Sequence, residues 1–333
     1  MSSKFNPALS SLRIAIVTPS AVTRRTGNRH TAARWRRFLR EAGHDARVHG
    51  RWDGKPVDLL LALHARKSYE AIRAFRDAFP DRPLVLALTG TDLYRDIRVD
   101  SKAQEALRLA TRLIVLQDRG ADELAPELQG KVHVVYQSAP PLTVRQRLPG
   151  RAVCVIGHLR EEKDPFRAAL ALSHIPPTAP IHVVQLGAAL APEFARRARA
   201  LMDREPRYRW IGELPRPKAR RTLAASWLMV VSSHMEGGAN VIAEAVMSGV
   251  PVLASRVPGN VGMLGEDYPG YFPVGDEKAL AALLTRADTD PTFYEALRAA
   301  CAARQPLFLP EREMGALLAA VSSAADPALP PPH

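Results

Sequence analysis

The sequence has 333 residues, which is enough for about two domains of ordinary size. Hydrophobic residues make up 47% of it and charged residues 24%, so a disordered chain is excluded and the apolar content suffices for two cores. The formal net charge of +12 favours anionic partners such as nucleotides or phosphates.

Cysteine content and hydropathy narrow the class of protein further. The two cysteines, Cys154 and Cys301, exclude a disulfide framework and a cysteine-rich metal site. No apolar run approaches the ~18 residues that a membrane-spanning helix needs, and residues 1–11 lack the apolar centre of a secretion signal. We therefore expect a soluble, cytoplasmic protein.

The first half of the chain alternates apolar runs of strand length with helical patterns. The runs are continuous rather than interrupted by polar residues, which is typical of parallel strands covered on both faces. A helix is expected over residues 30–42, because Trp35 and Phe38 recur at helical spacing. The strands are expected at residues 12–18, 57–63, 83–88, 113–117 and 132–136.

The same alternation restarts after a proline-rich stretch, residues 139–150, which we interpret as a linker. Two doubly wound, Rossmann-like α/β domains are expected, facing each other across a cleft at the carboxyl ends of their strands. We place them at residues 1–145 and 146–310, followed by a C-terminal helix over 311–333 that returns to the first domain and ends in a frayed tail. The later strands are expected at residues 152–157, 181–187, 208–212, 228–232, 250–254 and 271–274, and the helices between them include residues 164–173, 192–205 and 239–248.

A glycine-rich loop between a strand and a helix, within residues 232–245, carries the clearest chemical signal. Gly237 and Gly238 let the backbone turn tightly and approach a ligand. The free N–H groups at the start of the next helix would bind a diphosphate. Glu236 and Glu244 would accept hydrogen bonds from sugar hydroxyls. The alternative interpretation is a pair of solvated helix carboxylates beside a glycine turn.

This motif, over residues 236–258, resembles the E-x7-E signature of the GT-B glycosyltransferases of the family-4 type. The resemblance implies that Glu236 contacts the donor sugar and acts in catalysis. It also implies that Glu244 contacts the ribose of the nucleotide. Ala239 and Asn240, at the start of the helix, would complete this part of the donor site.

The loop at residues 157–163 resembles the G-R-L-x-x-E-K loop of the same family. That likeness implies that Lys163 holds the donor diphosphate, with Gly157 at the turn. His158 stands where the family has arginine, and a neutral imidazole binds phosphate less well than a guanidinium does. Either Arg160 replaces that arginine or His158 has another use. The alternative for Lys163 is an ordinary surface lysine.

No metal ion and no cofactor is expected besides the substrates. Asp288 and Asp290 form a D-x-D, the pattern of metal-dependent sugar transferases of a different fold. Here the pattern precedes Pro291 and a helical run, so a helix N-cap with proline in the first turn explains it better.

Three loops at strand ends of the first domain are rich in hydroxyl groups, glycine and cations. This composition suggests a small anionic acceptor rather than a lipid or a long glycan. The alternative is that several of these cations are solvated surface residues. The acceptor-binding residues are expected to be Gly27, Asn28, Arg29, His64, Arg66, Lys67, Thr89, Gly90 and Thr91.

Segments 18–20, 26–35, 63–68 and 88–94 narrow the resemblance to the selenosugar synthases of selenoneine biosynthesis, and the likeness covers residues 12–320. It implies transfer of selenium from selenophosphate to the anomeric carbon of a UDP-sugar. UDP-N-acetylglucosamine is the expected donor, and UDP and phosphate are the expected by-products. Enzymes that form selenophosphate upstream and selenoneine downstream are then candidate partners for substrate handover.

Both substrates of such a reaction are anions. At a separation of ~6 Å and an effective dielectric of ~20, two dianions repel by about 11 kcal/mol, so the site has to be cationic. The cations of the acceptor loops are expected on one wall and Lys163 on the other. Selenium is already ionised and needs no strong base, and His64 or Asp92 would assist only the later P–Se hydrolysis.

Other functions stay open on the sequence alone. A conventional GT-B glycosyltransferase would share Glu236 and Glu244 but would need a base near its hydroxyl acceptor. A UDP-sugar epimerase is a further alternative. Nucleic-acid binding is disfavoured, because the arginines are dispersed and aromatic residues are only 6%. Basic segments at 196–199 and 218–221 are interpreted as solvated helix faces, so no stable membrane association is expected.

Overall fold

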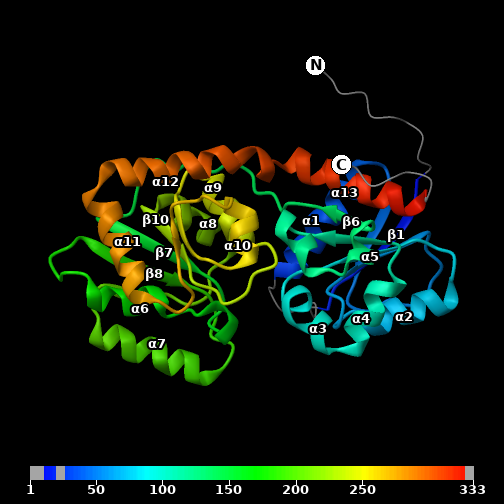
Figure 1. Cartoon of the computed structure of the whole chain (residues 1–333), viewed down its shortest axis with the longest axis horizontal. Helices are drawn as coiled ribbons and strands as arrows, with labels where there is room; N and C mark the ends of the chain where they lie inside the picture. Colours follow the sequence, from blue (N-terminus) through cyan, green and yellow to red (C-terminus); the bar gives the residue numbers. More distant parts are fainter. Residues whose placement is uncertain (1–10, 20–26, 327–333) are drawn as a thin grey trace, which may run out of the picture. The chain divides into compact units, whose positions relative to one another are not determined.

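A computed structural model gives the structure of residues 11–19 and 27–326. The chain divides into two compact units, residues 1–137 with 310–333 (unit 1) and residues 138–309 (unit 2), whose elements are labelled in Figure 1. The sequence-based statements about residues 1–10, the loop at 20–26 and the tail at 327–333 lie outside the described residues. Among those that are described, no helix has both the length and the apolar character to cross a membrane.

The sheet of unit 1 has six parallel strands in the order β2-β1-β3-β4-β5-β6. They are β1 (Arg13–Val17), β2 (Asp45–His49), β3 (Leu59–Leu63), β4 (Leu84–Ala87), β5 (Arg112–Val115) and β6 (Val132–Val134). All except β2 overlap the predicted strands. The sequence does not predict β2, because this edge strand carries Asp45, Arg47 and His49 and lacks a continuous apolar run.

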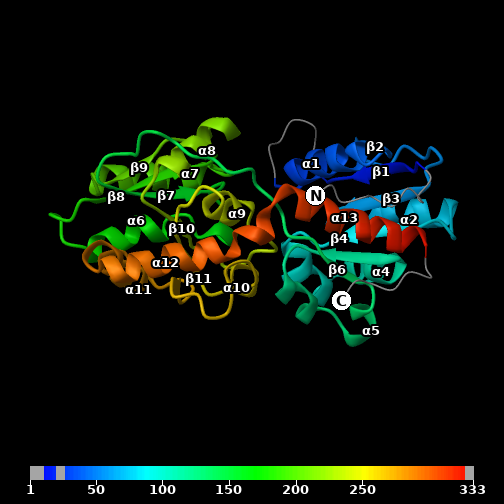
Figure 2. The ribbon, with the colours of Figure 1, turned by 90° about the horizontal axis from the view of Figure 1, so that it is seen from above.

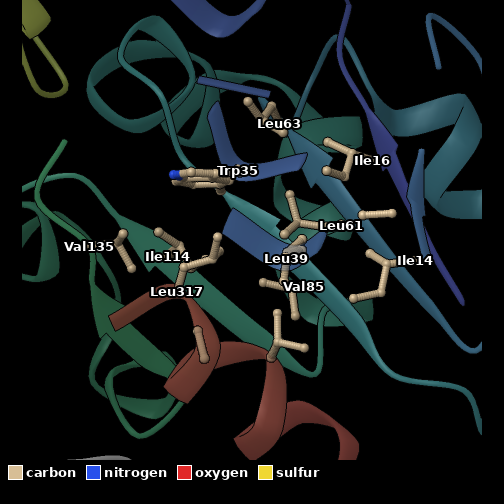
Figure 3. Packing of buried hydrophobic residues seen from close by; sticks show 14 of the residues in the cluster. Ile14, Ile16, Trp35, Leu39, Leu61, Leu63, Val85, Ile114, Val135 and Leu317 are labelled. Atoms are coloured by element: carbon tan, nitrogen blue, oxygen red, sulfur yellow. The ribbon is translucent and has the colours of Figure 1, made fainter. Parts of the chain in front are cut away.

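Apolar side chains are buried on both faces of this sheet, which explains the continuous hydrophobic runs. Along β1, Ile14 is buried on one face and Ala15 on the other. The helices are α1 (Gly27–Glu41), α2 (Tyr69–Ala78), α3 (Ile97–Val99), α4 (Ser101–Leu109), α5 (Pro126–Gln129) and α13 (Pro310–Ala325), with short helical turns η1 (Asp92–Asp96) and η2 (Asp118–Glu123). Helices α1 and α13 cover the first face, where Trp35 and Leu317 join the core (Figure 3), and α2 and α4 cover the second.

A buried ion pair fixes helix α13 to α1. The carboxylate of Glu313 is fully buried, and its Oε1 accepts hydrogen bonds from Trp35 Nε1 at 2.8 Å and from Arg34 Nε at 3.0 Å. Its Oε2 lies 2.8 Å from the same Arg34 nitrogen. The last helix of the described chain therefore packs within unit 1, against β4, β5 and β6 (Figures 1 and 2).

The sheet of unit 2 also has six parallel strands, in the order β12-β11-β10-β7-β8-β9, and all of them overlap predicted strands. They are β7 (Arg151–Ile156), β8 (Ile181–Leu186), β9 (Tyr208–Trp210), β10 (Leu228–Val231), β11 (Val252–Ser255) and β12 (Tyr271–Phe272). The helices are α6 (Arg167–Ala171), α7 (Pro192–Arg204), α8 (Arg216–Ala225), α9 (Asn240–Val246), α10 (Pro258–Leu264), α11 (Glu277–Thr289) and α12 (Pro291–Arg304), with short helical turns η3 (Glu161–Lys163), η4 (Leu172–His174) and η5 (Gln305–Phe308).

Three histidines of unit 1 lead to a prediction about pH. His44, His64 and His133 are buried, and burial lowers the pKa of each imidazole. As the pH falls below about 6.5, the unfolded chain therefore binds protons that the folded chain does not. The free energy of unfolding is expected to be largest above about pH 6.5 and to decrease toward about pH 5, as measured by chemical denaturation across this range.

His133→Gln tests this explanation, because it removes one of the buried imidazoles. The variant is expected to lose less stability than the parent protein between about pH 7 and pH 5. His174→Gln is the control, since His174 is exposed and its replacement should leave the pH dependence unchanged. Equal pH dependence in the parent and His133→Gln would show that this histidine does not contribute.

Candidate functional site

The loops that follow β7 and β10 meet at the carboxyl edge of the unit 2 sheet. The strand order reverses between these two strands, which is where open α/β sheets form a ligand crevice. The N–H of His234 donates to the carbonyl of Glu162 at 3.0 Å, and Ser232 Oγ donates to the carbonyl of Asp164 at 2.8 Å. The small pocket at this point is lined by residues that include Gly157, Lys163, Ser233, Glu236 and Val241. The structure thus brings the two predicted donor loops together.

Glu236 lies in this pocket and is only 8% exposed. Its Oε1 accepts hydrogen bonds from Lys163 Nζ at 2.6 Å and from Ser233 Oγ at 2.6 Å. The ammonium group compensates the cost of burying a carboxylate. Among the described residues, none donates to Oε2 of Glu236. One oxygen is therefore fixed by the protein, and the other is available to accept a hydrogen bond from a ligand.

The backbone around Glu236 rests on helix α10 and on β11. A Cβ at Gly259 would lie 1.8 Å from the carbonyl oxygen of Glu236, so only glycine fits there. Ser255 Oγ donates to the carbonyl of Ser233 at 2.6 Å, and Asn260 Nδ2 donates to the carbonyl of Ser255 at 2.9 Å. These contacts fix the chain on both sides of the Glu236 side chain.

The two motif glycines lie in a turn without left-handed backbone angles, and their predicted approach to a ligand stays a prediction. Neither Gly237 nor Gly238 is among the described residues with positive φ, so the turn at this point does not use the left-handed freedom of glycine. Gly237 is buried and Gly238 is half-buried. Helix α9 begins at Asn240, directly after Ala239, and is shorter than the predicted helix.

A strained turn positions Lys163. Asp164, the next residue, has left-handed backbone angles (φ 41°, ψ 58°), which are unfavourable for a residue with a Cβ. Its carboxylate accepts a hydrogen bond from Arg167 Nε at 2.8 Å, and Arg167 also pairs with Glu277. These ion pairs hold the turn that brings the ammonium of Lys163 to Glu236.

The other basic residues of this loop take different positions. Arg160 Nε lies 3.8 Å from Glu162 Oε2, and the Arg160 side chain is 39% exposed. His158 is half-buried. A Cβ at Gly187 (φ 144°) would lie 1.9 Å from the carbonyl oxygen of Gly157, so the loops after β7 and β8 are in backbone contact. The cation at the buried glutamate is thus the predicted lysine, whereas the roles of His158 and Arg160 stay predictions.

Glu244 is the second buried carboxylate of the motif, and it is 7% exposed. Its Oε1 accepts two hydrogen bonds from Arg216, from Nε at 3.0 Å and from Nη2 at 2.8 Å. Arg220, one helical turn further along α8, donates from Nη2 to the carbonyl of Pro140 at 2.6 Å. Burial lowers the pKa of Arg220, and the Glu244 charge opposes that shift. Arg220 is therefore half-buried and engaged, in contrast to the solvated face that the sequence suggested.

The D-x-D sequence forms a helix start, which confirms the N-cap interpretation. Asp290 Oδ1 accepts a hydrogen bond from the N–H of Phe293 at 3.1 Å, and Pro291 occupies the first turn of α12. Asp288 Oδ1 lies 2.7 Å from Arg151 Nε. In the part of the chain that the structure describes, no group of three or more His, Cys, Asp or Glu side chains is arranged to hold a metal ion.

In unit 1, Asp92 joins the loops that follow β3 and β4. It is fully buried. Its Oδ1 accepts hydrogen bonds from the N–H groups of Thr89 at 2.9 Å and Gly90 at 2.8 Å, and its Oδ2 accepts one from Ala65 at 3.0 Å. Asp92 therefore anchors the two predicted acceptor loops to each other, and its part in P–Se hydrolysis stays a prediction.

His64 has a backbone conformation that is rare for a residue with a side chain. Its φ is +75°, and it is 3% exposed. Nδ1 accepts a hydrogen bond from the N–H of Lys67 at 3.4 Å, so the ring proton belongs on Nε2, which lies 3.1 Å from Thr91 Oγ1. Burial lowers the pKa of the imidazole, which keeps it neutral near pH 7. Strain of this kind at a strand end is common at functional sites.

In each of two threonines of these loops, the hydroxyl oxygen accepts a hydrogen bond from another side chain. Thr91 Oγ1 accepts from His64, and Thr89 Oγ1 accepts from Asn28 Nδ2 at 3.1 Å. Each hydroxyl proton can therefore be donated to a ligand. Gly27 and Arg29, also predicted to bind the acceptor, lie with Asn28 in the first turn of α1.

Arg66 and Lys67 line a surface cavity of about 470 Å³, together with Glu70, Asp100 and Lys102. Arg66 Nε lies 2.9 Å from Asp100 Oδ2, and Lys102 Nζ lies 2.7 Å from Glu70 Oε1. Within the described residues Lys67 has no ion-pair partner and is exposed. Two of the three cations in this cavity are therefore already paired, and Lys67 is the one available for an anion.

Sequence reasoning missed three residues of this site, namely Ser233, Arg216 and Gly259. Ser233 lies two residues after the end of β10 and three residues before Glu236, so its place within the motif is visible in the sequence. Arg216 is separated from Glu244 by 28 positions, and no local pattern connects them. Only the folded chain reveals that contact.

Comparisons with known proteins agree with this architecture. Residues 146–304 match the family model described as glycosyl transferases group 1. The chain is 24% identical over 278 residues to glycosyltransferase 1 domain-containing protein 1 of Xenopus tropicalis, a match that covers 74% of this chain and 80% of that protein. Anabaena HepE, crystallised with UDP and glucose, superposes with a TM-score of 0.72 at 17% identity, covering 94% of this chain and 100% of that one. Sucrose-phosphate synthase from Thermosynechococcus elongatus superposes with a TM-score of 0.76 at 17% identity, covering 93% and 99%.

Proposed function

We propose that this chain uses a UDP-sugar as donor and selenophosphate as acceptor, because residues 146–304 match the family model of the group 1 glycosyl transferases and the chain has the GT-B fold. The expected fold class, two doubly wound Rossmann-like units of the GT-B type, is confirmed. The choice of selenophosphate as acceptor is the part of the proposal that goes beyond the fold and the family match. It is supported by the loops of unit 1 and by the resemblance of residues 12–320 to the selenosugar synthases.

The donor half of the proposal is supported by the two buried glutamates of unit 2. Glu236 and Glu244 each have one oxygen bonded to a cation and a second oxygen that no described residue occupies. Such oxygens accept hydrogen bonds from hydroxyl groups of the sugar and of the ribose. In this proposal Lys163 balances negative charge as the diphosphate leaves. HepE, with the same fold, has been crystallised with UDP and glucose, which is in keeping with this assignment.

The observation that best supports an anionic acceptor is the hydrogen bonding of the titratable side chains in the loops after β3 and β4. His64 and Asp92 are buried and already hydrogen-bonded, whereas Thr89 and Thr91 have hydroxyl protons to donate. A hydroxyl acceptor would need a base to remove its proton. An acceptor that is already an anion needs donors instead, and selenophosphate meets that requirement.

The proposed reaction proceeds in two steps without oxidation or reduction. Selenium attacks the anomeric carbon, a C–Se bond forms, and the bond from that carbon to the diphosphate oxygen breaks, so that UDP leaves with the electron pair. Water then attacks phosphorus, the P–Se bond breaks, and phosphate is released. The 1-selenosugar keeps the selenium as a selenol or selenolate.

Mass spectrometry of a single mixture tests the proposal. The protein is incubated with selenophosphate and several UDP-sugars, UDP-N-acetylglucosamine among them. We expect UDP release that depends on selenophosphate, together with a 1-selenosugar product. A parallel panel of hydroxyl acceptors without selenophosphate should give no glycoside.

Two results would overturn the proposal in favour of a competing function. Transfer of the sugar to a hydroxyl acceptor, with selenophosphate inert, would identify a conventional glycosyltransferase. Isomerisation of the sugar with no acceptor present would identify an epimerase.

Replacement of Thr91 tests the acceptor loop by itself. Thr91→Val removes a hydroxyl that donates to a charged oxygen in the proposed complex, and such hydrogen bonds are worth about 1.5–3 kcal/mol. We expect kcat/KM for selenophosphate to fall by roughly tenfold or more. The affinity for UDP, measured by calorimetry, should be unchanged. A parallel loss of UDP affinity would contradict the assignment of this loop to the acceptor.

A further inference from the structure

The function proposed above uses the buried carboxylate of Glu244 but assigns no role to Arg216, whose guanidinium bonds that carboxylate. We propose that Arg216 is a positioning residue that turns Oε2 of Glu244 toward a ribose hydroxyl, so that the chain selects ribonucleotide over deoxyribonucleotide donors. This inference rests on the proposed binding of a UDP-sugar in unit 2. It explains how that site would distinguish ribose from deoxyribose.

The geometry of the pair differs from the parallel fork that arginine and a carboxylate frequently form. Two nitrogens of Arg216, Nε and Nη2, donate to the same oxygen, Oε1, at 3.0 and 2.8 Å, whereas a parallel fork would use both oxygens. Among the described residues, no donor contacts Oε2 of Glu244. The pair therefore fixes the direction of the carboxylate and keeps one oxygen available.

Burial makes this fixation necessary. Glu244 is 7% exposed, and an ionised carboxylate at such a position is costly unless it is paired. Without Arg216 the carboxylate would turn toward Arg220, whose pKa the Glu244 charge raises against the effect of burial. This change would remove a well-directed acceptor from the site. The side chain of Arg216 is 38% exposed, so within this pair the arginine contacts solvent and the carboxylate is buried.

The first glutamate of the motif shows the same arrangement with different partners. Both Lys163 and Ser233 donate to Oε1 of Glu236, and Oε2 receives no donor from the described residues. Two buried carboxylates from one loop and helix are thus each held through one oxygen. A pair formed only for stability has no reason to repeat this division between the two oxygens.

Calorimetry with three nucleotides tests the inference. UDP, 2′-deoxy-UDP and 3′-deoxy-UDP are titrated into the parent protein, Arg216→Met and the control Arg221→Met. Arg221 lies on the same helix and is exposed. In the parent protein, loss of a hydrogen bond to a charged group should weaken at least one deoxynucleotide by about tenfold or more. The quantity compared is the ratio of the dissociation constant of that deoxynucleotide to the dissociation constant of UDP. In Arg216→Met this ratio should fall to within about threefold, mainly through weaker UDP binding. Arg221→Met should keep the ratio of the parent protein.

Three results would overturn the inference. If Arg216→Met weakens all three nucleotides by the same factor, the arginine has only a structural role. If the parent protein binds UDP and both deoxynucleotides equally, Glu244 does not contact the ribose, although nucleotide binding itself stands. If the parent protein does not bind UDP, the proposed function fails and the inference fails with it. Should Arg216→Met not fold, Arg216→Gln is measured instead, with the same expected loss of the ratio.

Discussion

Glu236→Gln is expected to lower kcat by about 100- to 1000-fold, the usual effect of removing one preorganised electrostatic group from an active site. The amide keeps the size of the side chain but loses the negative charge that Lys163 balances at 2.6 Å. It also places an N–H₂ group next to either the ammonium of Lys163 or the ligand hydroxyl. Steady-state release of UDP measures the effect.

The control for this prediction is Glu193→Gln, because Glu193 is an exposed glutamate in the first turn of α7. Its kcat should equal that of the parent protein. Thermal unfolding of Glu236→Gln should remain close to that of the parent protein, since Ser233 can still donate to the amide oxygen. If turnover of Glu236→Gln stays within about threefold of the parent, this glutamate lies outside the reacting centre.

Glu313→Ala is expected to destabilise unit 1 by about 3–5 kcal/mol, which is the usual cost of removing one partner from a buried ion pair. The substitution leaves the Arg34 guanidinium, 9% exposed, without the carboxylate that it bonds, and it deprives Trp35 Nε1 of its acceptor. It also weakens the attachment of α13 to the sheet. We expect the midpoint of thermal unfolding to fall by roughly 6–20 °C.

Two further variants separate the ion pair from other effects of changing helix α13. Glu311→Ala changes an exposed glutamate two residues earlier, and it should shift the midpoint only slightly. The double variant Arg34→Met with Glu313→Leu replaces both charges by apolar groups and should recover most of the lost stability. If the double variant is as unstable as Glu313→Ala, the loss comes from packing of the helix and not from the unpaired charge.

The strands of both sheets follow from local sequence patterns, with one exception. Buried parallel strands need apolar residues at every position, so β3 and β10 appear in the sequence as unbroken hydrophobic runs. The edge strand β2 has polar residues at alternate positions, and only Ala46 in it is fully buried, because the face that carries Asp45, Arg47 and His49 is not covered as the central strands are. An edge strand of this kind has no apolar run for sequence reasoning to detect.

Part of the candidate site can likewise be predicted from the sequence, and part of it cannot. The spacing of Glu236 and Glu244 and the lysine at position 163 are visible in the sequence, because motif residues lie close together in the chain. Two of the residues that contact them, Gly259 and Arg216, are distant in the sequence. They reach the glutamates only because the fold brings the first turns of α10 and α8 next to the motif.

The parallel α/β architecture, the positions of eleven strands and the two motif carboxylates can be predicted from local sequence, because each depends on residues within a few positions of one another. Three features depend on the folded chain: which oxygen of each carboxylate is fixed, which ring nitrogen of His64 carries the proton, and the complete burial of Asp92. The physical reason is that hydrogen bonds and burial depend on groups from separate elements, and their direction exists only once the sheets have formed.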